Sequence, residues 1–221
     1  GARIKFGMRG VAGAIQGVKI EEGRLLLDVI DGISPAGICG SGAVDLVAEL
    51  LRNHVITPDG RLCAANETED KQLAERIIQT KDGPAFLLAA KGASSLPSDL
   101  YFTQKDIREV QLAKAAIAAG IKILCKEKNV LPRDLKCIYL AGAFGNYIKP
   151  ENALRIGLLP FIESSKIVPV GNAAGNGAVF MLLDSRQREL AESLSRKVGV
   201  IELASHADFQ ALFAEEMKFP Q

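Results

Sequence analysis

Hydrophobic positions in the first half of the chain recur with two different periods, and the period indicates which element each stretch forms. Two short apolar runs separated by Glu21, Glu22 and Gly23 indicate a β-hairpin. Spacings of three and four residues indicate helices, and a continuous apolar run bounded by glycine indicates a strand. The expected elements are hairpin strands at 18–20 and 24–30, helices at 43–51 and 70–79, and a strand at 84–89.

The longest periodic segment begins at Thr103. Thr103 and Asp106 resemble a capping box with aspartate in place of glutamate, which indicates where a helix starts. Apolar residues then repeat at helical spacing as far as Leu124. Alanine and glycine fill the middle of this helix, so we expect another backbone segment to approach it closely.

The second half of the chain alternates strands and helices in the same way. The expected elements are a strand at 136–140, a loop at 142–146, a helix whose first turn holds Pro150, a strand at 167–170, helices at 173–183, 187–197 and 207–217, and a strand at 198–203. This alternation predicts an α/β fold. No repeat or linker divides the chain, so residues 1–221 are expected to form a single domain.

Composition narrows the functional classes. With 48% hydrophobic and 24% charged residues, the chain has an ordinary globular composition. A formal net charge of +1 argues against nucleic acid as a partner, and an aromatic content of 5% without tryptophan argues against base-stacking surfaces. No apolar stretch approaches the length of a membrane span, so no membrane partner is expected.

The cysteines and histidines show no catalytic or metal-binding spacing. Cys39, Cys63, Cys125 and Cys137 form no close pair, which predicts buried, unreactive thiols in a protein of the reducing cytoplasm. The two histidines have no partner residues nearby in sequence and are interpreted as solvated or capping residues. No catalytic residue and no metal ligand is therefore assigned.

The chain opens at Gly1 without an initiator methionine or the features of a signal peptide. We interpret this start as a cut inside a longer protein.

Three loops rich in small residues each precede a predicted helix. They span 35–42, 138–146 and 170–178. Backbone N–H groups at a helix start bind phosphate or sugar hydroxyls well when no side chain blocks them, but glycine-rich helix entries are also common as tight turns. Each loop by itself fits either interpretation. Together, on one α/β layer, they suggest a crevice of nucleotide size.

These motifs resemble, in order, the C-terminal region of the reductive activators of corrinoid proteins. The resemblance rests on four segments and on the opening Gly7-Met8-Arg9-Gly10, and it spans almost the whole chain. The four segments are Ser34-Pro35-Ala36-Gly37-Ile38-Cys39-Gly40-Ser41-Gly42, Phe102-Thr103-Gln104-Lys105-Asp106-Ile107, Leu140-Ala141-Gly142-Ala143-Phe144-Gly145-Asn146 and Gly171-Asn172-Ala173-Ala174-Gly175-Asn176-Gly177-Ala178.

The resemblance implies an actin-like, ribonuclease H-like lobe of the acetate and sugar kinase/Hsp70/actin (ASKHA) superfamily, with a mixed sheet and flanking helices. It implies ATP or ADP with Mg²⁺ as ligand, and a [2Fe-2S] cluster held only by an upstream ferredoxin domain. The implied activity returns a cob(II)amide corrinoid protein of a methyltransferase system to cob(I)amide. A homodimer is left open.

The resemblance also implies roles for particular residues. The implied nucleotide-binding residues are Gly40, Ser41, Gly42, Gln104, Gly142, Ala143, Phe144, Gly145 and Asn146. The implied hinge, where two helices cross, holds Ala174, Gly177 and Ala178.

Two departures from the family pattern bear on activity. Ala143 stands where a second glycine is usual in the adenosine motif, which hinders a close approach to the ribose. The aspartate-glycine phosphate loops of the superfamily are not found in this chain and are expected upstream, so the chain alone is expected to be inactive as an ATPase. The related activators of radical 2-hydroxyacyl-CoA dehydratases hold a [4Fe-4S] cluster through cysteines near Gly37 and Asp99, and neither position is cysteine here.

Two alternatives stay open at this point. The chain could be a non-catalytic actin-like module that docks a corrinoid protein, or a part of a small-molecule kinase.

Overall fold

The computed structural model describes residues 3–220, and the side chain of Ala143 lies outside that description. The N-terminal part forms a mixed sheet of order β2-β1-β3, built from β1 (Ala14–Glu21), β2 (Arg24–Val29) and β3 (Gly37–Ile38). β1 runs antiparallel to β2 and parallel to β3. Glu22 and Gly23 both have positive φ, as a tight two-residue hairpin turn requires.

Helix α1 (Gly40–Arg52) lies against β1, and its polar side chains bond the edge of that strand. The hydroxyl of Ser41 donates to the carbonyl of Gln16 over 2.8 Å. The amide of Ile20 donates to Glu49 Oε2 over 2.7 Å, and Arg52 donates to the carbonyl of Ile20. Because these side chains follow one another at helical spacing, one stripe of α1 serves the strand edge as a neighbouring strand would.

A second sheet follows the short helix α2 (Lys71–Ala74). It is antiparallel, of order β4-β5-β6, and comprises β4 (Ile77–Thr80), β5 (Gly83–Ala89) and β6 (Leu100–Thr103). The sheet leads directly into α3 (Gln104–Glu127), whose start is the predicted capping box of Thr103 and Asp106.

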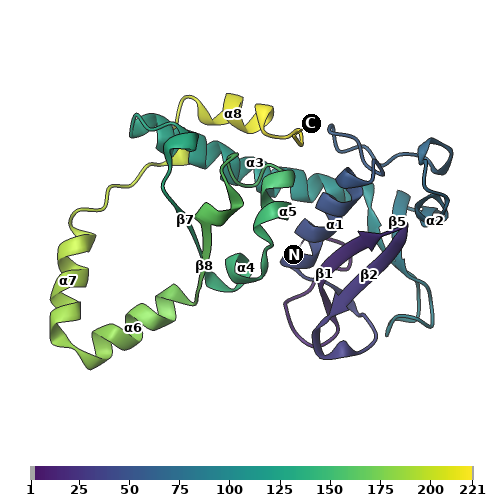
Figure 1. Cartoon of the computed structure of the whole chain (residues 1–221), viewed down its shortest axis with the longest axis horizontal. Helices are drawn as coiled ribbons and strands as arrows, with labels where there is room; N and C mark the ends of the chain where they lie inside the picture. Colours follow the sequence, from purple (N-terminus) through teal and green to yellow (C-terminus); the bar gives the residue numbers. More distant parts are fainter. Residues whose placement is uncertain (1–2, 221) are drawn as a thin grey trace.

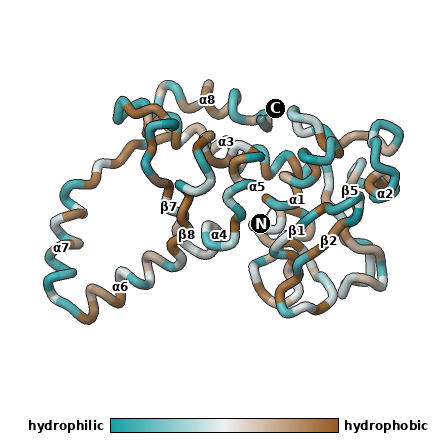
Figure 2. Tube along the Cα trace, in the orientation of Figure 1, coloured by the Kyte–Doolittle hydropathy of each residue, from teal (hydrophilic) through white to brown (hydrophobic). Residues whose placement is uncertain are grey.

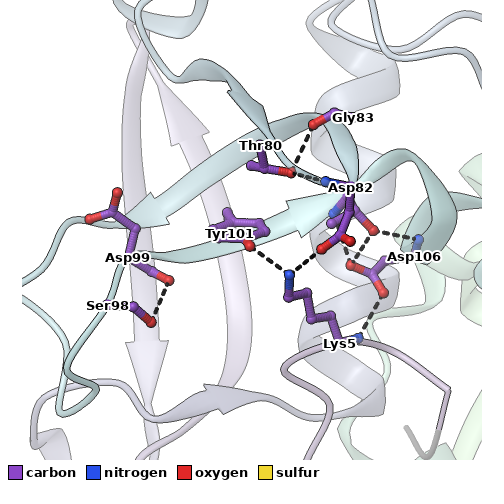
Figure 3. Close-up of polar contacts among 9 residues, drawn as sticks. Lys5, Thr80, Asp82, Gly83, Ser98, Asp99, Tyr101 and Asp106 are labelled. Atoms are coloured by element: carbon purple, nitrogen blue, oxygen red, sulfur yellow. Dashed lines mark hydrogen bonds and ion pairs between the residues drawn. The ribbon is translucent and has the colours of Figure 1, made fainter.

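Lys5 fastens the N-terminal segment to this second sheet (Figure 3). Its ammonium group pairs with Asp82 and donates to the hydroxyl of Tyr101 over 2.6 Å, and these bonds raise the pKa of Lys5. Its backbone N–H donates to Asp106 Oδ1 over 2.8 Å. The segment before β1 is thereby joined to the start of α3.

The remaining elements surround a third, two-stranded parallel sheet of β7 (Ile138–Ala141) and β8 (Ile167–Gly171). The helices are α4 (Gly142–Tyr147), α5 (Pro150–Arg155), α6 (Ala173–Leu183), α7 (Ser185–Ser195) and α8 (Phe209–Glu215). Figure 1 shows α3 crossing the molecule, with α8 along it, while α6 and α7 extend from the body as an arm. Among residues 3–220, no helix combines the length and apolarity needed to cross a lipid bilayer.

The C-terminal residues form a strap across α3. The amide of Gln111 donates to the carbonyl of Met217 over 2.8 Å, and Nζ of Lys114 donates to the carbonyl of Lys218 over 2.6 Å. Phe219 is buried, and its backbone N–H donates to the carbonyl of Pro58 over 2.8 Å. The strap therefore closes the core over a lysine that is itself buried.

Several predicted elements differ from the structure. The helix expected at 70–79 ends at Ala74, because 77–80 is a strand paired with β5, where β-branched residues pack well. The loop expected at 142–146 is helical, and the strand expected at 198–203 is absent because no neighbouring strand pairs with it. The strands of residues 3–220 form three small sheets where one α/β layer was expected.

We expect Glu49→Ala to lower the free energy of unfolding by about 2–3 kcal/mol, because the buried N–H of Ile20 loses its acceptor. Glu21→Ala is the control on the same hairpin: Glu21 is exposed, and its loss should change stability by no more than about 0.5 kcal/mol. Urea unfolding measures both. Equal losses in the two variants would contradict the role given to Glu49.

A second prediction concerns the pH dependence of stability. Burial lowers the pKa of Lys114. The unfolded chain then binds more protons between that lowered pKa and the ordinary value of 10.5, so Lys114 makes stability rise with pH across this window. Lys114→Met should remove this rise.

Lys122 is the matched control. Burial acts to lower its pKa, but the ion pairs with Glu216 and Glu215 together outweigh burial and raise it. Its contribution to stability is present below the ordinary pKa and is lost as pH rises through the folded value. In unfolding measurements between pH 8 and 11, Lys122→Met should therefore change the slope in the opposite direction. Slopes that change in the same direction would contradict this assignment.

Candidate functional site

The first turn of α1 contains the three small residues expected to form a glycine loop. Gly40, Ser41 and Gly42 lie inside the helix, which starts three residues earlier than its apolar pattern indicated. A Cβ atom on Gly42 would lie 2.2 Å from the carbonyl oxygen of Ile15, so glycine is required there for the helix to touch β1. Ser41 is buried and faces β1 through its hydroxyl.

The second small-residue segment, 142–146, starts α4 at the carboxyl end of β7. Gly142 has a φ of +85°, a conformation that residues with a side chain rarely adopt, and no atom lies within 4 Å of the place its Cβ would take. Gly145 packs against the backbone of Leu140, while Asn146 is exposed. Of Ala143, the backbone lies in α4 and the side chain lies outside the described residues.

Phe144 brings α4 and α1 together. Its ring lies on Gly40, where a Cβ atom would be 2.7 Å from Cε2 of Phe144. Phe144 remains 47% exposed, so contact with Gly40 covers the residue only in part. Beside this contact is a cavity of about 290 Å³, a size that suits one small ring system. The cavity is lined by Arg3, Ile4, Gly40, Ala43, Val44, Glu109, Val110, Ala113, Lys114, Ile117, Phe144, Ile156 and Leu158.

A buried carboxylate provides a second link between the same elements. Asp45 of α1 is 1% exposed. Its Oδ1 accepts from Asn152 Nδ2 over 2.6 Å, and its Oδ2 accepts from Lys149 Nζ over 2.7 Å and from the N–H of Val18 over 3.3 Å. One charge thus joins α1 to β1 and to the start of α5, directly after α4. This link keeps Phe144 close to Gly40.

The other predicted site residues lie elsewhere. Gln104 bonds the backbone of the loop that follows α1: its Nε2 donates to the carbonyl of Gly60 over 2.6 Å, and its Oε1 accepts from the N–H of Leu62 over 2.7 Å. Gln104 does not line the cavity beside Phe144. Ala174, Gly177 and Ala178 lie on α6, which has no buried residue and packs mainly with α7.

The remaining polar candidates form no catalytic arrangement. Within residues 3–220, no group of three or more His, Cys, Asp or Glu residues could hold a metal ion. All four cysteines are free; Cys39, Cys63 and Cys125 are buried as predicted, whereas Cys137 is only partly buried. Burial raises the pKa of Cys63, which keeps this thiol unreactive. His206 lies 3.5 Å from Glu127 and accepts from the N–H of Asp208, far in sequence from both helix starts.

Comparison with known proteins identifies the family. Residues 1–221 match the family model described as the C-terminal domain of RACo, the ASKHA domain. This chain belongs to that family.

Individual relatives agree with this assignment. The corrinoid activation enzyme RamQ of Eubacterium limosum is 38% identical over 210 residues, which cover 95% of this chain and 35% of the relative. A [Co(II) methylated amine-specific corrinoid protein] reductase of Methanosarcina barkeri is 29% identical over 92% of this chain and 38% of the relative. A solved structure named reductive activator for corrinoid, iron-sulfur protein superposes with a TM-score of 0.89 and 34% identity, covering 100% of this chain and 35% of that chain.

The match confirms the predicted fold class: this is an ASKHA domain with an actin-like fold, a mixed sheet and helices. The chain spans only about a third of the length of the relatives it matches. Within this ASKHA domain, α1 and α4 are the two helix starts that the structure brings together, and the cavity beside Phe144 lies between them and α3.

The sequence did not single out the residues that join these helices. Asp45, Lys149 and Asn152 belong to none of the sequence motifs, although Asp45 interrupts the apolar stripe of a helix expected to be buried. Read together, Ser41, Asp45 and Glu49 recur every four residues, and a polar row on a buried helix face predicts bonds to a neighbouring strand edge.

We expect Gly42→Ala to destabilise the domain by about 1–3 kcal/mol or more, because its Cβ would overlap backbone that cannot move without shifting β1. Gly177→Ala is the control within another helix: its Cβ meets no atom within 4 Å, and the change should stabilise by up to about 1 kcal/mol. Thermal unfolding compares the two variants. A tolerated Gly42→Ala would show that α1 does not need its close contact with β1.

Proposed function

We propose that this chain is the nucleotide-binding C-terminal lobe of an ATP-dependent reductive activator, which returns a cob(II)amide corrinoid protein of a methyltransferase system to cob(I)amide. The observation that supports this most is the family match over residues 1–221 together with relatives whose names describe corrinoid activation and corrinoid-protein reduction. In this proposal residues 1–221 are one domain of a longer protein.

The site fits the adenosine part of a nucleotide better than its phosphates. The partly exposed Phe144 and the apolar cavity beside it offer a surface for a flat ring. Gly142 leaves open space at the start of α4, where a ribose could approach the backbone. We therefore propose Gly40, Gly42, Gly142, Phe144, Gly145 and Asn146 as the residues around adenosine. Ser41 and Gln104, both engaged by the protein's own backbone, would act by shaping the site.

The described residues do not fit a dedicated metal centre. No cluster of metal-ligating side chains exists in 3–220, so Mg²⁺ would accompany the nucleotide's phosphates. The four dispersed cysteines do not fit a [2Fe-2S] cluster, which we place in a different domain of the full-length protein. We derive no step through either group.

The proposed partner is the corrinoid protein of a methyltransferase system, and the proposed location is the cytoplasm, in keeping with four unpaired cysteines. A homodimer is also compatible with the exposed apolar residues of α6.

Titration calorimetry of the full-length protein with ATP and ADP separates the proposal from a non-catalytic docking module, which would bind neither. Transfer of the γ-phosphate to a small molecule would instead indicate a kinase.

We expect Gly142→Asp to abolish nucleotide binding by the full-length protein. The change places a charged side chain at the start of α4, at a positive φ that aspartate adopts less readily than glycine. Gly92→Asp is the matched control: Gly92 also has a positive φ with no atom within 4 Å, but it lies in the loop after β5. Calorimetry should give wild-type affinity for Gly92→Asp. Unchanged affinity in Gly142→Asp would disprove the adenosine site while leaving corrinoid-protein binding to be measured separately.

A further inference from the structure

The two outer edges of the β1–β2 hairpin differ in whether their backbone groups are hydrogen-bonded. The edge of β1 is bonded by α1, through Ser41, Asp45 and Glu49. In the part of the chain that the structure describes, the edge of β2 has no strand beside it, since β2 is the outermost strand of its sheet. Proteins usually protect such edges, because unpaired N–H and C=O groups form a template for another strand. β2 contains no proline, and the register irregularity of the hairpin lies near its end.

The register shows which backbone groups point outward from β2. Val18 and Ile20 turn their N–H groups toward α1, away from β2. Their partners Leu27 and Leu25 therefore direct their own N–H and C=O groups away from β1, as opposed residues do in an antiparallel ladder. Within residues 3–220, these outward groups of Leu25 and Leu27 make no hydrogen bond.

The open edge lines a groove of about 980 Å³. The opposite wall consists of the end of β5, from Leu87 to Ala89, and of Arg76. From β2 the groove is lined by three leucines, a valine and, at the start of the strand, Arg24. An extended segment entering it would therefore find apolar side chains, a second cation and a free strand edge together. This combination is the one used when a peptide adds a strand to a sheet.

Arg76 gives the groove a positive charge that the chain does not neutralise. Its Nη1 donates to the carbonyls of Leu87, over 3.1 Å, and Leu88, over 3.5 Å. No carboxylate in 3–220 forms an ion pair with it, although Glu75 also lines the groove, and burial lowers the pKa of Arg76. A guanidinium held partly out of water and without a counter-charge gains strongly from a carboxylate that approaches in its plane.

We propose that this groove binds an extended acidic segment of a partner protein, which pairs with the open edge of β2 and places an Asp or Glu side chain against Arg76. The occupant is identified by two complementary features, the unpaired strand edge and the uncompensated cation. The proposal does not depend on nucleotide binding, because the groove shares no lining residue with the cavity beside Phe144.

In the test, a library of displayed random hexapeptides is first selected for binding to the full chain. Selected peptides should contain Asp or Glu flanked by β-branched or aromatic residues. For one such peptide, binding measured by fluorescence anisotropy should weaken at least about tenfold when its acid is changed to the amide, and as much in Arg76→Met. When Arg76→Met is combined with the amide-substituted peptide, the two losses of affinity should not add, because both changes remove the same contact. Arg186→Met is the control: it removes an exposed arginine and has the same net charge as Arg76→Met, and it should bind the peptide as tightly as the unchanged chain does.

Amide hydrogen exchange supplies an independent measurement. Bound peptide should slow exchange at Leu25 and Leu27, whose N–H groups become paired, without changing the already bonded amide of Ile20. If Arg76→Met does not fold, the amide-substituted peptide and the exchange measurement still decide. The proposal is overturned if the selected peptides contain no acidic residue, or if Arg76→Met binds them as tightly as the unchanged chain does. It is also overturned if bound peptide leaves hydrogen exchange at the Leu25 and Leu27 N–H groups unchanged. Self-association through β2 that excludes the peptides would also overturn it, in favour of a second copy of the chain.

Discussion

The buried carboxylate of Asp45 is the interaction on which most of this domain's geometry depends. It lies at the middle of α1 and bonds three residues outside it, one in β1, one directly before α5 and one in α5. A buried charge is costly unless its oxygens are bonded, and here all of its partners are donors. Removing Lys149 would leave the charge uncompensated, and removing Asn152 would leave one oxygen without its donor, so the relative positions of sheet and helices are strongly specified at this point.

The candidate nucleotide site follows from that arrangement. With α1 held against β1 and α5 held against α1, the short helix α4 has little freedom, and Phe144 comes to rest on Gly40. Small residues at Gly40 and Gly42 then serve two different contacts, one with an aromatic ring and one with the backbone of β1. The C-terminal strap adds a further constraint, because Gln111 and Lys114 hold it over the same helix that lines the cavity.

The arm of α6 and α7 has the opposite character. Figure 2 shows an apolar stretch along the second half of α6, and Val179, Phe180, Leu182 and Leu183 are all exposed. A helix that is apolar on every side is normally buried. The family's hinge lies in this segment by resemblance, and the small residues Ala174, Gly177 and Ala178 would allow close helix crossing. That role stays a prediction, since α6 packs here mainly with α7.

The sequence by itself determined the elements whose signal is local. The hairpin at Glu22 and Gly23, the capping box of Thr103 and Asp106, and the start of α5 at Pro150 depend on neighbouring residues, so periodicity and turn chemistry were sufficient. The ordered glycine motifs likewise identified the ASKHA fold. Only the tertiary structure decided that 77–80 is a strand, that Gln104 serves a loop, and that Asp45 meets Lys149 and Asn152. These outcomes depend on partners in other elements, up to 107 residues away, and spacing within one element contains no information about such partners.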